Sequence, residues 1–378
     1  MAEPSLTGGA GAARESGPAA AQPAAAQPAA AQPAPQRFAP GSPRVLVAGA
    51  TGFAGALAAH LLWRHPRFEL AGITGRSELG RRLQDVYPRY RVPLEIEQLD
   101  AGRLDRLGPL DAAIVAYPHA AAAPTVAALL ERAVRVIDLS ADFRLADRST
   151  YERHYGEHPR PELLSEAVYG LTELHRERIA GARIVANPGC YPTAAVLGLA
   201  PLARAGLLAD VVIDAKQGLS GAGRTFDETT HLSMAGENIT PYKVAAHRHT
   251  PEIEEQLSDL DPAHRKLAVQ FQAHLVPLDQ GELASCYVTP TRPLGAAELA
   301  ALYEQAYAAE PFVEVVADPP GVREVRETNY CRILAAADPH TGKVLVFAAI
   351  DNLWKGTSSQ AIQNLNVMFG LPETEGLS

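Results

Sequence analysis

An apolar run near residue 44 leads directly into a glycine turn. Residues 44–48 have the continuous apolar pattern of a strand that is buried on both faces. Gly49-Ala-Thr-Gly52-Phe-Ala-Gly55 follows, and a helical pattern then extends from Ala56 to about Trp63. In a strand-turn-helix unit such glycines let the backbone approach a pyrophosphate at the helix N-terminus. The stretch therefore predicts a dinucleotide site, although glycine turns can also serve helix-sheet packing alone.

The same alternation of strand and helix continues to residue 139. Strand patterns cover 69–74, 112–116 and 135–139, and a helical pattern covers about 124–133. Repeated units of this length predict an α/β protein with a doubly wound parallel sheet, the Rossmann arrangement. In such a sheet the ligand lies at the carboxyl ends of the strands.

The pattern changes after a helix over 193–205. Mostly strands follow, with one further helix at about 296–309, so we predict a second domain of α+β type with one sheet. The strands are expected at 211–216, 267–275, 283–289, 313–316 and 343–350.

Four segments result from these patterns. Residues 1–42 repeat Pro-Ala-Ala-Ala-Gln and are expected to be disordered, because they are poor in large apolar residues. Residues 43–190 form the dinucleotide-binding domain and 191–354 the α+β catalytic domain. Residues 355–378 contain apolar residues at helical spacing, and we expect this helix to return to the dinucleotide-binding domain.

Composition excludes several classes of protein. The formal net charge of −9 argues against a general nucleic-acid binder. Three cysteines without a C-x-x-C pair are too few for a disulfide framework and indicate a reducing, cytoplasmic setting. No apolar stretch approaches the length of about 18 residues that a membrane span needs.

A cysteine lies at the predicted start of the central helix. Asn187-Pro-Gly-Cys190-Tyr-Pro-Thr193 has the pattern of strand end, tight turn and helix start. The N–H groups and the dipole at a helix N-terminus favour a thiolate, so Cys190 is a candidate nucleophile. The alternative is a small buried apolar residue.

The segment from Ala245 to Ile253 predicts a second helix start. Thr250 is the expected N-cap and Pro251 the first helical residue, so His249 lies just outside the cap. The positive end of the helix dipole disfavours imidazolium there, and His249 is a candidate neutral base. No second ligand cluster with zinc-like spacing accompanies the His-x-His pair, so we expect no metal.

Cations mark candidate anion sites. The second strand ends at Gly75-Arg76-Ser77, where an NAD-binding domain has an acid, so NADP is favoured over NAD unless Arg76 is a solvated loop residue. Arg144 follows a strand and is a candidate anion clamp or a structural ion-pair partner. The glycine-rich loop 217–224 forms an anion-binding nest or only a flexible connection.

Four motifs together resemble the N-acetyl-γ-glutamyl-phosphate reductase family of arginine biosynthesis, which is related to the aspartate-semialdehyde dehydrogenases. They are Gly49-Ala-Thr-Gly-Phe-Ala-Gly55, Asn187-Pro-Gly-Cys-Tyr-Pro-Thr193, His247-Arg-His-Thr-Pro-Glu-Ile253 and Asp351-Asn-Leu-Trp-Lys-Gly356. The resemblance covers about residues 44–370, and the motif around Cys190 is the most specific.

The resemblance implies a reductase of N-acetylglutamyl 5-phosphate. Cys190 would be the nucleophile that forms a thioester, His249 the acid-base partner and NADPH the reductant. A cytoplasmic homo-oligomer, a dimer or a tetramer, is also implied. The expected cofactor residues are Gly49, Thr51, Gly52, Phe53, Gly55, Arg76, Ser77, Gly221, Gly223 and Asn352. The expected substrate residues are Arg144, Asn187 and Arg248, with Lys216 and Arg224 as further candidate cations.

Two other functions remain open from the sequence. One is a reductase of the same architecture that acts on aspartyl phosphate or on a carrier-bound aminoadipyl phosphate. The other is a non-catalytic dinucleotide-binding sensor, which would tolerate the loss of Cys190 or His249.

Overall fold

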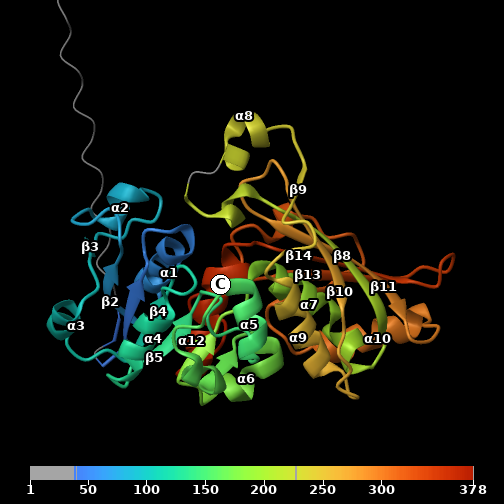
Figure 1. Ribbon diagram of the computed structural model, residues 1–378, viewed down its shortest axis with the longest axis horizontal. Coiled ribbons are helices and arrows are strands. Elements are labelled where there is room, and N and C mark those ends of the chain that lie inside the picture. Colours follow the sequence, from blue (N-terminus) through green and yellow to red (C-terminus); the bar gives the residue numbers. More distant parts are fainter. Residues whose placement is uncertain (1–37, 40, 226–227, 378) are drawn as a thin grey trace, which may run out of the picture. The chain divides into compact units, whose positions relative to one another are not determined.

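Two seven-stranded sheets organise the structure, a computed structural model that describes residues 38–39, 41–225 and 228–377 (Figure 1). The predicted disordered tail, residues 1–42, lies almost wholly outside the described residues.

The first sheet is parallel throughout, with the strand order β3-β2-β1-β4-β5-β7-β6. After β1 the chain adds β2 and β3 on one side of that strand, and then β4 and the later strands on its other side. This topological switch point between β1 and β4 opens a crevice at the carboxyl ends of the strands. The strands are β1 Arg44–Ala48, β2 Glu69–Thr74, β3 Ile96–Glu97, β4 Ala112–Val115, β5 Arg135–Asp138, β6 Ala167–Tyr169 and β7 Ile184–Ala186.

Helices cover both faces of this sheet, because successive side chains of a strand point to opposite sides. Val45 and Val47 pack in one apolar cluster with α1, whereas Leu46 and Ala48 pack in another with α3 and α4. The predicted Rossmann arrangement is therefore confirmed. The helices of this part are α1 Phe53–Arg64, α2 Leu83–Val86, α3 Ala101–Leu107, α4 Ala123–Leu130, α5 Arg148–Tyr155 and α6 Thr172–Ala180, with a 3₁₀ turn η1 at Pro161–Glu166.

The second sheet is mixed, with the order β12-β13-β14-β11-β8-β10-β9. The predicted α+β architecture is confirmed. Its strands are β8 Leu208–Gln217, β9 Thr240–Tyr242, β10 Val269–Leu275, β11 Glu282–Pro290, β12 Val313–Val315, β13 Cys331–Ala337 and β14 Val344–Ile350. The helices are α7 Cys190–Arg204, α8 Leu232–Ala235, α9 Thr250–Leu260, α10 Ala296–Tyr307 and α11 Val322–Val325, with 3₁₀ turns η2 Leu219–Ala222 and η3 Glu228–Thr230.

One face of the second sheet carries the long helices. Residues of α7, α9 and α10 share a single apolar cluster with alternate residues of β8, β11 and β14. α7 is the central element of this layer, because residues 191–203 are all buried. The helix that begins with the candidate nucleophile is thus held rigidly by its own packing.

Strand β13 is absent from the sequence-based prediction. It reads Cys-Arg-Ile-Leu-Ala-Ala-Ala, with a single β-branched residue and an alanine run that has little strand preference. It lies between β12 and β14 in the sheet, so tertiary pairing decides its conformation. The short strands β3, β6 and β9 were also not predicted.

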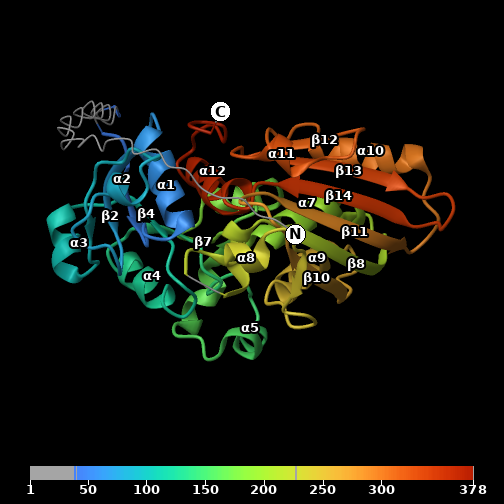
Figure 2. The same ribbon diagram turned by 90° about the horizontal axis from the view of Figure 1, so that it is seen from above.

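The C-terminal segment packs on the first sheet's helices. A π-helical turn η4, Trp354–Ser358, leads into α12, Ser359–Met368. α12 lies beside α1 (Figure 2) and also contacts α6. Ala361, Ile362 and Leu365 join the apolar cluster of α1. The polar residues of α12 are equally buried, so this helix has no solvent-facing side.

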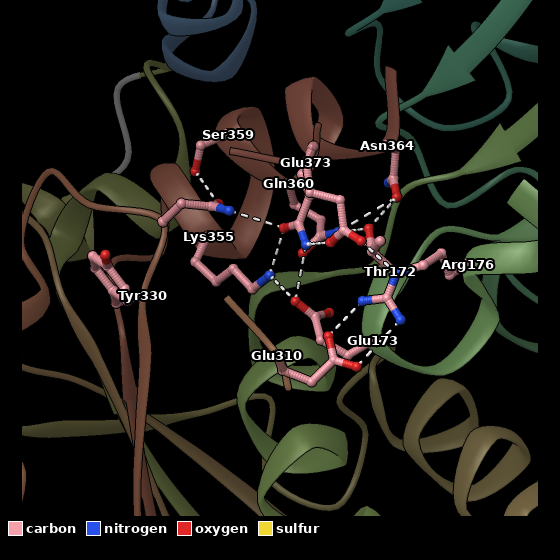
Figure 3. A network of polar contacts seen from close by, with 12 residues as sticks. Thr172, Glu173, Arg176, Glu310, Tyr330, Lys355, Ser359, Gln360, Asn364 and Glu373 are labelled. Atoms are coloured by element: carbon pink, nitrogen blue, oxygen red, sulfur yellow. Dashed lines mark hydrogen bonds and ion pairs between the residues drawn. The ribbon is translucent and has the colours of Figure 1, made fainter. Parts of the chain in front are cut away.

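A buried polar network holds these side chains, although Gln360 Oε1 and Asn366 Oδ1 have no hydrogen-bond partner among the described residues (Figure 3). Lys355 Nζ donates hydrogen bonds to Glu173 Oε1 at 2.6 Å and to Gln363 Oε1 at 2.7 Å, and the Lys355 and Glu173 side chains are fully buried. Burial opposes ionisation of Glu173, but the ammonium of Lys355 brings the pKa of that carboxyl below its usual value. The ion pair therefore joins η4 to α6.

We predict that Lys355→Met lowers the free energy of unfolding by about 3–5 kcal/mol, because it leaves the Glu173 carboxylate buried without a cation. Urea unfolding measures the change. The double variant Lys355→Met with Glu173→Gln should recover part of the lost stability. As a control, Arg82→Met removes the cation of the exposed Arg82–Asp85 ion pair and should lower the free energy of unfolding by less than about 1 kcal/mol. Equal losses for Lys355→Met and Arg82→Met would contradict the prediction.

Candidate active site

A cavity of about 1080 Å³ lies where the carboxyl ends of β1, β4 and β5 approach the start of α7. Its walls include Gly49 after β1, Tyr117 after β4 and Ser140 after β5. Cys190 and His249 line the same cavity. The predicted nucleotide turn and the predicted nucleophile therefore face one space.

The glycine turn is tight because neighbouring backbone fills the position of a side chain. Gly49 has φ +94°, and a Cβ atom there would lie 2.5 Å from the Ala116 carbonyl oxygen. A Cβ on Gly55 would collide with the carbonyl of Gly49. Gly49, Thr51 and Gly52 line the cavity, whereas Gly55 is not on its wall and serves the approach of α1 to the turn.

Other predicted cofactor residues lie at different distances from this space. Arg76 and Ser77 line the cavity, and the Arg76 guanidinium lies 4.9 Å from the centre of the Tyr117 ring. Phe53 does not line it and instead contacts Tyr87, with ring centres 6.3 Å apart.

The loop after β8 approaches Cys190. Gly221 lines the cavity, and a Cβ atom there would collide with the side-chain amide of Gln217. Gly223 has φ +87° and is not on the wall. Asn352 is also away from it: its amide accepts from the Gly281 N–H at 2.8 Å and donates to Ser220 Oγ at 3.0 Å. Asn352 thus supports this loop.

Cys190 is the first residue of α7, three residues before the predicted start of the helix. Its sulfur accepts a hydrogen bond from Gln217 Nε2 at 2.8 Å. A Cβ on Gly356 would lie 2.8 Å from Cys190 Cβ, so η4 packs directly on the cysteine.

The protonation state of Cys190 differs from the sequence-based expectation. Burial, and then the carboxyl group of Glu282, raise the pKa of the thiol well above its usual value. The Gln217 amide and the Tyr191 N–H work in the opposite direction without overcoming burial. The N–H groups and dipole of the helix start, which were expected to favour a thiolate, therefore do not outweigh burial, and the raised pKa favours the thiol.

His249 occupies the N-cap position of α9, one residue earlier than the predicted cap. Its ring packs on the turn before the nucleophile: a Cβ on Gly189 would lie 2.6 Å from His249 Nε2. Burial, then His247 and Arg144, lower the pKa of His249 well below its usual value. Nδ1 is buried without a hydrogen-bond partner among the described residues, so a neutral ring presents an uncommitted nitrogen.

Arg144 is buried and held by internal acceptors. Its guanidinium donates to the carbonyls of Asn187 and Leu139, both at 2.8 Å, and lies 3.4 Å from Glu252 Oε2. Glu252 also accepts from the Gly189 N–H at 2.9 Å. Arg144 still reaches the cavity wall, so it combines the two roles that the sequence left open: a structural ion pair and a cation facing the ligand space.

Of the remaining predicted residues, Arg248 and Arg224 line the cavity, whereas Lys216 and Asn187 do not. Arg248 lines the cavity and contacts His119 Nε2 at 3.0 Å. Asn187 is fully buried and donates to the Thr357 carbonyl at 3.0 Å. Lys216 pairs with Asp214 at 2.6 Å on its own strand, away from the cavity. Arg224 lines the cavity and pairs with Glu78 at 2.8 Å.

Several residues of the site were not predicted. Gln217 is the last residue of β8, directly before the glycine-rich loop, and that position in the sequence is the signal that could have identified it. Glu252 lies in the same motif as His249. Lys243 lines the cavity but carries no sequence signal, and Glu282 resembles an ordinary charge at the end of a strand.

Two negative findings apply to the described residues alone. Within 38–39, 41–225 and 228–377, no three His, Cys, Asp or Glu side chains form a group that could hold a metal ion. No helix of the same residues has both the length and the apolar character that a membrane crossing requires.

Comparison with known proteins identifies both parts of the chain. Residues 44–182 match the model of the semialdehyde dehydrogenase NAD binding domain, and residues 190–352 match that of the semialdehyde dehydrogenase dimerisation domain. Aspartate semialdehyde dehydrogenase II from Vibrio cholerae has the same fold, with a TM-score of 0.67, 18% identity and coverage of 87% of this chain and 99% of that chain.

Closer relatives give the family. The N-acetyl-gamma-glutamyl-phosphate reductase of Desulforudis audaxviator is 48% identical over 88% of this chain and 97% of its own length. That of Moorella thermoacetica is 46% identical over 88% of this chain and 96% of its own length. With the cysteine, the histidine and the glycine turn gathered on one cavity, these matches show that the chain belongs to the N-acetyl-gamma-glutamyl-phosphate reductase family of semialdehyde dehydrogenases.

Proposed function

We propose that the chain performs the family's reaction through a thioester on Cys190, with NADPH as the reductant. The substrate is N-acetyl-L-glutamyl 5-phosphate, and the products are N-acetyl-L-glutamate 5-semialdehyde and phosphate. One observation carries this proposal: a single cavity joins the glycine turn to Cys190 and His249. A cytoplasmic location, expected from the sequence, is part of the same proposal.

The first step makes a carbon–sulfur bond and breaks the bond between the acyl carbon and phosphate. The thiol of Cys190 must lose its proton, and the neutral ring of His249 is the candidate acceptor. The N–H groups of Cys190 and Tyr191 lie in the first turn of α7 and lack intrahelical partners, so they are candidates to stabilise the oxyanion. Phosphate leaves and the thioester remains.

Local cations offset the negative charge of both substrate and protein. Arg144, Arg248 and Lys243 line the cavity, although the whole chain has a formal net charge of −9. Arg144 is fixed by its carbonyl acceptors, so it offers a preorganised charge rather than a mobile one. Phosphate and carboxylate groups of the substrate are the expected ligands of this set.

The first domain fits a dinucleotide phosphate group. The absence of Cβ atoms at Gly49 and Gly55 closes the turn on the N-terminus of α1, which favours an anion. Arg76 and Ser77 offer a cation and a hydroxyl where an acid would select NAD. When bound, the cofactor would supply a hydride to the thioester carbonyl. The carbon–sulfur bond would then break, the semialdehyde would leave, and the Cys190 sulfur would take back a proton, for which His249 is the candidate donor. The aspartate semialdehyde dehydrogenase from Candida albicans, a structural relative with a TM-score of 0.63 and 15% identity, has been solved with NADP.

We also propose that the second sheet forms a homo-oligomer. Tyr287 pairs with Leu345 and with Val212 on the face opposite the helices, and these side chains are half-buried or exposed. The match to a dimerisation domain supports a second copy of the chain as the partner of this face.

The substrate and the nucleophile are tested together by following NADP⁺ reduction with phosphate and a panel of semialdehydes. N-acetylglutamate semialdehyde should give the highest kcat/KM, ahead of aspartate and aminoadipate semialdehydes. Cys190→Ala and Cys190→Ser should lower kcat by about 10³-fold or more, because no other group can form the thioester. Cys286→Ala, a buried strand position away from the cavity, is the matched control. Wild-type turnover in both Cys190 variants would refute the assignment.

Arg76→Glu should reduce the preference for NADPH over NADH by about tenfold or more, because it replaces a charge-assisted hydrogen bond with repulsion of the 2′-phosphate. The ratio of kcat/KM for the two cofactors measures this. Arg67→Glu, an exposed arginine away from the cavity, is the charge-matched control. An unchanged ratio in Arg76→Glu would show that another group reads the phosphate.

Leu345→Arg should shift the protein to a smaller oligomer, because it places an unpaired charge in the proposed contact face. Light scattering coupled to size-exclusion chromatography gives the mass. Leu79→Arg, at an exposed apolar position in the first domain, should leave the mass unchanged. A Leu345→Arg variant with the wild-type mass would place the interface elsewhere.

A further inference from the structure

Glu282 carries a buried carboxyl group close to Cys190. The reaction described above does not use this carboxyl group. Glu282 is the first residue of β11, opposite Gln217 of β8 and Ile350 of β14. Its side chain is fully buried. An apolar side chain would suit this strand position at lower cost, since a buried polar group needs partners to offset its desolvation. The position of Glu282 therefore calls for an explanation.

Gln217 connects Glu282 to Cys190. Its amide Nε2 donates one hydrogen bond to Cys190 Sγ at 2.8 Å and another to Glu282 Oε2 at 2.9 Å. An amide nitrogen has two hydrogens, so both are committed. The Gln217 amide also packs directly on Gly221, where a Cβ atom would collide with it. Glu282 thus fixes which end of the Gln217 amide faces the sulfur.

The described surroundings of Glu282 contain no compensating cation. The ionisable groups that act on it, or on which it acts, are Cys190 and Tyr191 of α7, Tyr242 of β9, Cys331 of β13 and Asp351 after β14. Among the described residues no Lys, Arg or His side chain acts on its pKa, and its Oε1 has no hydrogen-bond partner there. Burial, with a smaller effect of Asp351, raises the pKa of Glu282 to about 8.

We propose that Glu282 is a positioning residue of the reductase: through Gln217 it holds an amide N–H on the sulfur of Cys190, and through its own charge it opposes formation of the thiolate. This inference rests on the proposed function, because it takes Cys190 as the nucleophile. Glu282 acts through Gln217 and through space, and no contact with substrate is assigned to it.

The sign of the charge effect follows from the two protonation states. Below pH 8 or so Glu282 is neutral, and only burial resists ionisation of Cys190. As the pH rises through that range Glu282 becomes a carboxylate, and a thiolate beside it would be a second negative charge in the same buried space. As the pH rises past this range, the fraction of Cys190 present as thiolate therefore increases less than it would beside a neutral group.

The reactivity of Cys190 towards iodoacetamide tests the charge effect without turnover. Alkylation of the Cys190 peptide is followed by mass spectrometry across the pH range in the full-length protein. In the wild type the logarithm of the rate should stop rising steadily near pH 8, as Glu282 ionises. In Glu282→Gln it should keep rising, and Cys190 should react about tenfold faster at about pH 9.5.

Glu282→Leu separates the two parts of the proposal. It also lacks the charge, so it should show the same uninterrupted rise, and it decides the test should Glu282→Gln not fold. It lacks an acceptor for Gln217 as well, so its kcat should fall about tenfold further than that of Glu282→Gln with little change in KM. Asp214→Asn removes a half-exposed acid from β8 away from the cavity and should keep the wild-type profile.

The possible results separate the parts of the proposal. If the alkylation rate of Cys190 still stopped rising near pH 8 in folded Glu282→Gln or Glu282→Leu, the charge of Glu282 would have no role in the effect. Equal kcat in Glu282→Leu and Glu282→Gln would overturn its hold on Gln217. Turnover by Cys190→Ala would instead refute the proposed function, and the alkylation profiles of Glu282 variants would still report on Glu282.

Discussion

The ion pair between Lys355 and Glu173 is the interaction on which the geometry of the site depends. It is fully buried, and it ties the π-helical turn η4 to α6. Gly356 of that turn packs on Cys190, and the neighbouring Asn364 of α12 donates to Asn187 Oδ1 at 3.1 Å, three residues before the cysteine. The C-terminal segment thus fixes the nucleophile from behind. A buried pair is a poor source of net stability, but it specifies one arrangement, since each unpaired alternative is costly.

The resting charges at the site favour a neutral pair. Burial keeps Cys190 as a thiol and His249 as an unprotonated imidazole, since desolvation penalises whichever form is charged. Before substrate binds, a thiolate and an imidazolium would each need stabilisation from the protein. The cost is lower when the negative charge moves on to a substrate that Arg144 and the first turn of α7 can stabilise. The formal net charge of −9 does not prevent this stabilisation, because the cations on the cavity wall act locally.

Sequence patterns predicted what depends on local chemistry. The apolar run and glycine spacing predicted the first sheet, and the motif around Cys190 identified the family because tight turns restrict residue choice. Strand β13 escaped because pairing on both sides gives its alanine run an extended form. The raised pKa of Cys190 was not predicted because a helix N-terminus is visible in a sequence, whereas the burial that outweighs it is not. Asn187 was predicted to bind substrate and Asn352 to bind cofactor. Their hydrogen bonds to Thr357, Gly281 and Ser220 support loops of the site, and the ligand contacts stay predictions because contacts of this kind are not visible in a sequence.

Two buried acids show how a partner decides the state of a group. Glu173 and Glu282 are both withdrawn from water, and burial alone would raise the pKa of each carboxyl group. At Glu173 the ammonium of Lys355 at 2.6 Å reverses that effect, so the carboxylate persists and its role is structural. Glu282 has an amide and an acidic neighbour instead, and the pKa remains raised, to about 8. A carboxyl group whose pKa is raised to about 8 beside a cysteine can respond to the chemistry of that cysteine, whereas one locked in an ion pair cannot. The absence of a cation from the described surroundings of Glu282 is therefore what separates it from a residue that only holds the fold.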